Sequence, residues 1–110
     1  MPKRDPDLLI EDILGAIQKI ERYTTGLDEE RFRQDEKTVD AVVRNLEVIG
    51  EAARQLPEAF VAQHPSVPWR QIAGLRNRIV HGYFGLDLEI IWQVIRHDLQ
   101  QLRNGLEGLS

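Results

Sequence analysis

The sequence predicts an all-α fold, an antiparallel bundle of four to five helices. Apolar residues recur every three or four positions over long stretches, which is the spacing of one helix face. Alternating apolar and polar residues, typical of half-buried strands, are missing, and so are internal repeats. The chain has 110 residues, of which 42% are hydrophobic and 29% are charged. This composition suits one globular domain over residues 1–110.

The first helix is expected to begin at Pro6 with Asp5 as its N-cap, because both residue types are favoured at these positions. Its apolar stripe closes near Gly26, and the charged residues 27–34 form a linking turn or a short helix. The stripe consists of Leu9, Ile13, Ile17 and Ile20.

A second helix is expected from Asp35 to near Pro57. Gly50 lies inside it, where glycine costs about 1 kcal/mol relative to alanine. We therefore expect a close helix crossing at Gly50. Asp40 and Arg44 have the spacing of a salt bridge within the helix.

The second half of the chain predicts three further helical segments. Residues 57–63 form a short piece, and Ser66 is the expected N-cap of a helix that runs to Ile79. Asp87 is the expected cap of the last helix, whose apolar face continues to Leu106. Trp69 and Trp92 fit core or interface positions better than base-stacking positions.

Several classes of site are excluded by composition. The chain contains no cysteine, which excludes disulfides, thiolate zinc sites and a cysteine nucleophile. The three histidines are too scattered for a zinc signature, so we expect no metal and no cofactor. No apolar run reaches the roughly 18 residues of a membrane span. Acidic residues interrupt the N-terminal apolar stretch, so we expect no signal peptide and a cytoplasmic location.

Charge is distributed unevenly along this acidic chain, whose net charge is -4. Fourteen of the 18 acidic residues lie at or before Glu58, and the next one is Asp87. The window between them is predicted to bind an anion or a phosphate, although a buried helix would equally explain it. Its arginines and histidines are His64, Arg70, Arg76, Arg78 and His81.

The candidate chemistry lies at the end of this window. Arg76 could bind phosphate through two parallel hydrogen bonds, and His81 could exchange protons near neutral pH. Asn77, four residues before His81, could orient the imidazole. Arg76 and His81 are about 140° apart on a regular helix. They would converge if the helix ends near Val80 or if two copies meet across a symmetry axis, which favours a composite site in a dimer.

Each of these residues also has a structural interpretation. Arg76 could be a solvated surface residue, His81 could cap a helix end, and Tyr83 could be a core aromatic. Glu47 and Glu51 form a weaker candidate, a paired-carboxylate acid–base site, because nothing nearby in the sequence completes it.

Residues 76–83, Arg-Asn-Arg-Ile-Val-His-Gly-Tyr, resemble the Arg-x4-His-x-Tyr motif of HepT-type toxins in the HEPN superfamily. Residues 40–53 are similar to that family's second-helix signature, and residues 68–70 to the segment that leads into the motif. Residues 85–92 resemble the start of its final helix. The resemblance extends from Leu8 to about Leu102, in the same order as in the family.

The resemblance implies a helical homodimer whose paired motifs line a cleft at the interface. It implies the toxin of a type VII-like toxin–antitoxin system, a metal-independent endoribonuclease encoded beside an MntA-like nucleotidyltransferase antitoxin. Arg76, Asn77 and His81 would be catalytic, and Arg70 and Arg78 would bind RNA. Tyr83 would be the tyrosine that the antitoxin AMPylates to silence the toxin.

Two competing functions remain open at this point. A non-catalytic module could use the same arginines to hold a nucleotide or a partner nucleotidyltransferase. A purely structural helical dimer would explain the predicted fold but not the window without carboxylates.

Overall fold

The computed structural model describes residues 5–79 and 85–109, and the predicted residues His81 and Tyr83 lie outside them. Within the described ranges the chain is helical and contains no β-strand, which confirms the all-α prediction. The elements are α1 (Pro6–Thr24), α2 (Glu29–Gln34), α3 (Glu36–Gln55), α4 (Glu58–Gln63), α5 (Trp69–Ala73), α6 (Leu75–Ile79), α7 (Leu88–Gln93), the π-helical segment η1 (Val94–Asp98) and α8 (Leu99–Glu107).

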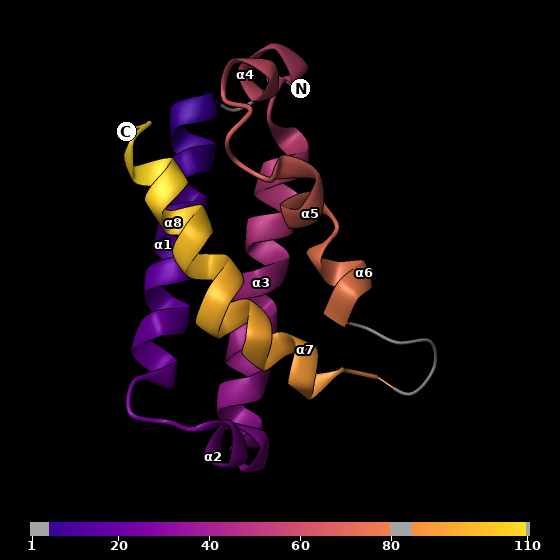
Figure 1. Cartoon of the computed structure of the whole chain (residues 1–110). Helices are drawn as coiled ribbons and strands as arrows, with labels where there is room; N and C mark the ends of the chain where they lie inside the picture. Colours follow the sequence, from indigo (N-terminus) through magenta and orange to yellow (C-terminus); the bar gives the residue numbers. More distant parts are fainter. Residues whose placement is uncertain (1–4, 80–84, 110) are drawn as a thin grey trace.

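The long helices α1 and α3 lie antiparallel and side by side, connected through α2 at one end (Figure 1). The α7–η1–α8 helix crosses this pair, and α5 and α6 lie along α3 (Figure 1). The inward faces of the three long helical segments share one apolar core. Its most deeply buried side chains include Ile13, Ile17, Ile20, Phe32, Val42, Leu46, Ile49, Ile79, Ile91, Leu102 and Leu106.

Side-chain caps determine where several helices begin. The Asp5 carboxylate accepts a hydrogen bond from the Asp7 backbone N–H at 2.8 Å, and Asp87 accepts one from Ile90 at 3.0 Å. Both predicted caps are therefore confirmed. Asp35 likewise caps α3 by accepting from the Thr38 N–H at 3.1 Å. None of the described helices is long and apolar enough to cross a membrane.

The predicted cap at Ser66 is wrong. Pro68 occupies the N-cap position of α5 and provides no side-chain hydrogen bond. The buried Trp69 fixes the start of the helix instead. Its indole N–H donates to the His64 carbonyl at 2.9 Å, and its backbone N–H donates to the Val67 carbonyl at 2.8 Å.

The helix predicted to run from the Ser66 region to Ile79 is interrupted at Gly74, which separates α5 from α6. The crossing predicted at Gly50 is confirmed. A Cβ atom on Gly50 would lie 3.4 Å from the Ile72 carbonyl oxygen, so the missing side chain allows α5 to approach α3 closely. The C-terminal part of α5 therefore lies at the level of Gly50.

The last helix contains a feature that its periodicity did not predict, the π-helical turn η1. Such wider turns shift the following residues around the helix axis and often occur at functional sites. The buried Trp92 lies just before η1 and packs against Phe32 of α2, with ring centroids 5.3 Å apart. Trp69 is buried as well, so both tryptophans belong to the core.

Candidate functional site

The helix α6 presents three consecutive polar residues of the predicted motif. Leu75 and Ile79, four positions apart, are 3% and 0% exposed and anchor one face of this short helix in the core. Arg76, Asn77 and Arg78, which lie between them in the sequence, are exposed.

The chain returns to α6 after the motif. The Asp87 backbone N–H donates a hydrogen bond to the Ile79 carbonyl oxygen at 2.8 Å. The end of α6 and the start of α7 therefore lie together in the structure. The predicted convergence of Arg76 with His81, and the position of Tyr83, fall outside the described residues.

Arg76 lines a pocket of about 340 Å³ between α1, α3 and α6. This volume is at the lower end of the range for small-molecule sites. We call it the α3 pocket. Its lining residues are Leu9, Asp12, Arg44, Leu46, Glu47, Val48, Gly50, Glu51, Ala52, Arg54, Gln55 and Arg76.

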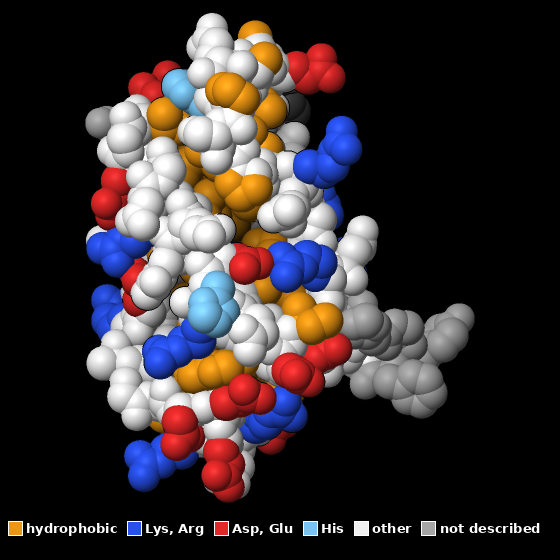
Figure 2. Space-filling model, viewed as in Figure 1, with side chains coloured by type: hydrophobic (Ala, Val, Ile, Leu, Met, Phe, Trp, Pro, Cys, Tyr) orange, Lys and Arg blue, Asp and Glu red, His pale blue; other side chains and the backbone are white. Residues whose placement is uncertain are grey.

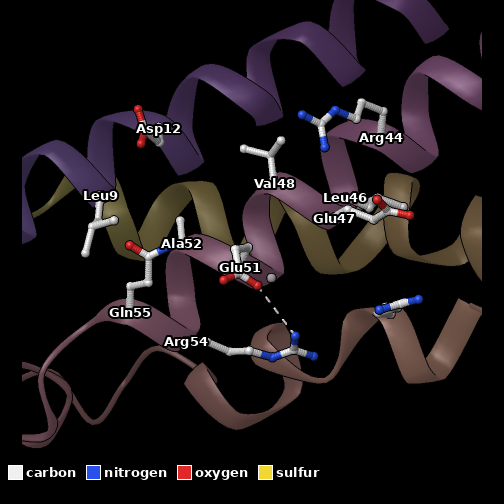
Figure 3. A pocket seen from close by; sticks show the side chains of 12 residues that line it. Leu9, Asp12, Arg44, Leu46, Glu47, Val48, Glu51, Ala52, Arg54 and Gln55 are labelled. Atoms are coloured by element: carbon white, nitrogen blue, oxygen red, sulfur yellow. Dashed lines mark ion pairs between the residues drawn. The ribbon is translucent and has the colours of Figure 1, made fainter. Parts of the chain in front are cut away.

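The lining of the α3 pocket carries both signs of charge. Glu47 and Glu51 lie on successive turns of α3, and the Arg54 guanidinium is directed toward Glu51 at 3.7 Å (Figure 3). Among the described residues, Arg44, Glu47 and Arg76 form no ion pair or side-chain hydrogen bond. The predicted Asp40–Arg44 salt bridge is likewise not formed in the described part of the chain.

The guanidinium of Arg78 reaches a different part of the molecule. It donates to the Asp98 carboxylate on η1 at 2.6 Å, and both side chains are about two-fifths exposed. Arg76 and Arg78 therefore diverge from α6, one toward α3 and the other toward the last helix. Arg70 is exposed on α5. It does not line the α3 pocket, and it does not take part in the contact between Arg78 and Asp98.

The window without carboxylates exists in the sequence but not in space. Helix packing brings Glu47 and Glu51 of α3 to Arg76, and Asp98 of η1 to Arg78. The surface therefore has mixed charge, and the predicted binding of an anion or a phosphate there stays a prediction. Elsewhere, Asp and Glu side chains gather over the end of the molecule that carries α2 (Figure 2).

The sequence named Glu47 and Glu51 of α3 only as a weaker, incomplete candidate, and it did not place Arg44 and Arg54 beside them in a pocket with Arg76. Arg44, Glu47, Glu51 and Arg54 recur at helical spacing on one face of α3, which was a usable signal. The sequence did not indicate which helix packs beside that face, because Arg76 is 25 residues from Glu51 along the chain. No group of three or more His, Cys, Asp or Glu residues that could hold a metal ion is found in residues 5–79 and 85–109.

Comparison with known proteins adds to this geometry. The family model of HepT-like ribonucleases matches residues 13–109. A protein of Thermococcus cleftensis named "probable ribonuclease HepT" is 40% identical over 107 residues, which cover 97% of each chain. No solved structure gives a significant match.

Two further relatives have names that describe them as candidate RNases. One, from Methanocaldococcus jannaschii, is 44% identical over 95 residues, or 86% of this chain and 78% of the relative. The other, from Caldanaerobacter subterraneus subsp. tengcongensis, is 37% identical over 106 residues, or 96% of this chain and 95% of the relative. The chain described here therefore belongs to the HepT-like ribonuclease family.

Proposed function

We propose that this protein is a metal-independent endoribonuclease that acts as the toxin of a toxin–antitoxin pair. One observation carries the proposal: in a chain of the HepT-like family, Arg76 of a well-anchored helix lines a pocket of about 340 Å³. The buried neighbours Leu75 and Ile79 hold the backbone that presents it. A phosphate-binding group on a rigid element is what phosphodiester cleavage requires.

The proposed chemistry is attack of an RNA 2′-hydroxyl on the adjacent phosphorus. Arg76 stabilises the negative charge that develops on the phosphoryl oxygens. His81 acts as general base on the 2′-hydroxyl or as general acid on the leaving 5′-oxygen. Asn77 orients His81 or the phosphate, and Arg70 and Arg78 bind the RNA backbone. The products carry a 2′,3′-cyclic phosphate and a 5′-hydroxyl.

The proposed active form is a homodimer with the two motifs facing one another across a cleft. A monomer of this size buries a modest core, so a second copy adds apolar burial. The open, mixed-charge surface around Arg76 is the part of the described chain that a second copy would enclose.

The proposed partner is an MntA-like nucleotidyltransferase antitoxin that AMPylates Tyr83. An added AMP group brings bulk and negative charge next to the RNA-binding arginines. Both effects exclude the substrate. The proposed site of action is the cytoplasm.

Induced expression of the wild type and of His81→Ala, without the nucleotidyltransferase, tests the proposal. Growth arrest with RNA fragments in the wild type alone supports a ribonuclease toxin that uses His81. Healthy growth with intact RNA, from well-expressed and unmodified wild type, contradicts it. That result would favour a non-catalytic module, and co-purification with the nucleotidyltransferase would then be measured in its place.

A further inference from the structure

We propose that the outer face of the π-helical turn η1 binds single-stranded RNA beyond the linkage that is cut. We call this face the η1 surface and define it by Arg96 and His97 of η1 together with Arg78 of α6. The inference rests on the proposed ribonuclease function and deepens it, because it states where a longer substrate runs.

The first step of the argument is the geometry of η1. The Leu99 backbone N–H donates to the Val94 carbonyl oxygen, five residues earlier, which is the hydrogen bond of a π-helix. The first two residues of η1 are buried in the core, whereas Arg96 and His97 are exposed and Asp98 is partly exposed. The turn therefore presents three consecutive polar side chains as an outer arc, and π-turns of this kind often occur at functional sites.

The second step is the contact that joins this arc to α6. Nη1 of Arg78 donates to the Asp98 carboxylate at 2.6 Å, which holds the Arg78 side chain beside η1. The other N–H groups of Arg78 form no hydrogen bond among the described residues, and its side chain is 41% exposed. Because a guanidinium has five N–H donors, Arg78 can bind a phosphate and keep the contact with Asp98. The η1 surface therefore continues onto the helix that carries Arg76.

The third step is the environment of Arg96. Its guanidinium lies over the indole ring of Trp92, with Cζ 5.2 Å from the ring centroid. Trp92 is held in turn by its packing against Phe32 of α2. Arg96 forms no ion pair or side-chain hydrogen bond among the described residues, so its charge is available to a ligand. Unstacked RNA bases stack on arginine planes and aromatic rings, and the exposed imidazole of His97 is a further ring beside it.

The fourth step is the charge around the η1 surface. Between Glu89 and Glu107 the last helix contains one carboxylate, Asp98, and its charge is compensated by Arg78. No carboxylate of another element forms an ion pair with Arg96 in the described part of the chain. Asp and Glu side chains gather instead over the end of the molecule that carries α2 (Figure 2). That end repels RNA, so a bound strand is directed along η1 and α6.

The test is the affinity of the wild type, Arg96→Ala, Arg96→Lys and Arg22→Ala for a labelled 2′-O-methyl RNA of about ten nucleotides. Fluorescence anisotropy at several salt concentrations measures the Kd. This RNA has no free 2′-hydroxyl, so binding is measured apart from cleavage. Arg22 is the matched control, an exposed arginine of α1 that lies over the Tyr23 ring at 5.7 Å from its centroid. Thermal unfolding of each variant shows whether it is folded.

We expect Arg96→Ala to raise the Kd about 5-fold or more, because it removes a stacking group and a charge. It should also reduce the slope of log Kd against log salt by about 1. Arg96→Lys keeps the charge but not the planar group, so it should keep the salt slope and still raise the Kd. Arg22→Ala should change neither quantity, and with a natural RNA it should leave kcat and KM unchanged.

Equal Kd in the wild type and folded Arg96→Ala would reject the η1 surface and leave the ribonuclease function intact. If Arg96→Ala instead weakened co-purification with the nucleotidyltransferase at unchanged RNA affinity, the η1 surface would be a protein interface, which also overturns the proposal. An Arg22→Ala variant as impaired as Arg96→Ala would show that the effect is one of overall charge. The expected Kd changes in a protein that cuts no natural RNA would support the η1 surface and reject the ribonuclease function alone.

Discussion

Arg76 and Arg78 lie two positions apart on α6, yet their side chains have different surroundings. Arg76 enters a pocket without an ion pair among the described residues, whereas Arg78 is bound to Asp98 at 2.6 Å. Arg76 is therefore available to a ligand, whereas Arg78 is bound to another residue of the chain. This difference predicts unequal consequences when each arginine is removed.

We expect Arg76→Ala to lower kcat/KM for RNA cleavage by about 100-fold or more, because it removes charge stabilisation from the transition state. Arg78→Ala should lower it by no more than about 10-fold, since a single phosphate contact adds little specificity. Asp98→Ala frees the Arg78 guanidinium, so it should tighten RNA binding at low salt and steepen the salt dependence of Kd. A larger loss of kcat/KM in Arg78→Ala than in Arg76→Ala would contradict this assignment.

Asp35 provides a prediction about pH. Hydrogen bonds from the Thr38 hydroxyl at 2.8 Å and the Thr38 backbone N–H at 3.1 Å hold the pKa of the Asp35 carboxyl below its ordinary value of 3.8. The unfolded chain takes up this proton at a higher pH than the folded chain. The stabilisation is therefore present above pH 3.8 and is lost as the pH falls through the lower folded-state pKa.

Asp35→Ala should accordingly lower the unfolding midpoint at pH 7 and show a weaker further decrease on acidification than the wild type. Denaturant titrations at neutral and acidic pH measure both effects. Asp40→Ala is the matched control, an exposed aspartate on the same helix without such a cap. An identical response of the Asp35 and Asp40 variants would contradict the role of the cap.

At the scale of elements, α3 and α5 cross at Gly50. Gly15 of α1 is a glycine with which Gly50 can be compared. A Cβ on Gly15 would meet nothing within 4 Å, so Gly15→Ala should raise the free energy of unfolding by up to about 1 kcal/mol. Gly50→Ala should give less than this, because its Cβ would already touch the Ile72 carbonyl oxygen at 3.4 Å. Gly50→Leu should cost about 1–3 kcal/mol by overpacking. Equal effects of the two alanine substitutions, measured by denaturant unfolding, would contradict the close crossing.

The short helix α2 depends on one buried side chain. Phe32 is 0% exposed and packs on Trp92, whereas its neighbour Arg33 forms an exposed ion pair with Glu29 at 2.8 Å. We expect Phe32→Ala to lower the free energy of unfolding by about 3–5 kcal/mol through loss of burial and cavity formation. Arg33→Ala should cost about 1 kcal/mol or less. Similar losses in the two variants would show that α2 is held by its surface charges instead.

Most helices of the bundle could be predicted from the local sequence, whereas the breaks within them could not. The stripes of α1 and α3, and the caps at Asp5 and Asp87, follow from spacing and residue type alone. The apolar spacing predicted neither the break at Gly74 nor the π-helical turn η1, because it indicates which face of a helix is buried and not the hydrogen-bond pattern along the helix. Ser66 failed as a cap because Pro68 takes the N-cap position of α5, and the indole N–H of Trp69 donates to the nearby His64 carbonyl.

The candidate site shows the same division between local and distant information. Arg76, Asn77 and Arg78 were singled out from the motif, and all three are exposed on α6. Their surroundings were not predictable, because Glu47 comes from α3 and Asp98 from the end of η1. The motif therefore predicts site residues from the segment around α6. The structure adds the residues of α3 and η1 that lie beside them.

At the scale of the whole molecule, the proposed function is RNA cleavage by a metal-independent site that depends on Arg76. The most direct measurement is incubation of purified wild type and Arg76→Ala with an end-labelled RNA in excess EDTA, followed by analysis of the product ends. We expect fragments with 2′,3′-cyclic phosphate ends from the wild type, and cleavage at no more than about 1% of the wild-type rate from the folded variant. Equal cleavage by Arg76→Ala, or cleavage by the wild type only after a divalent metal is added, would contradict it.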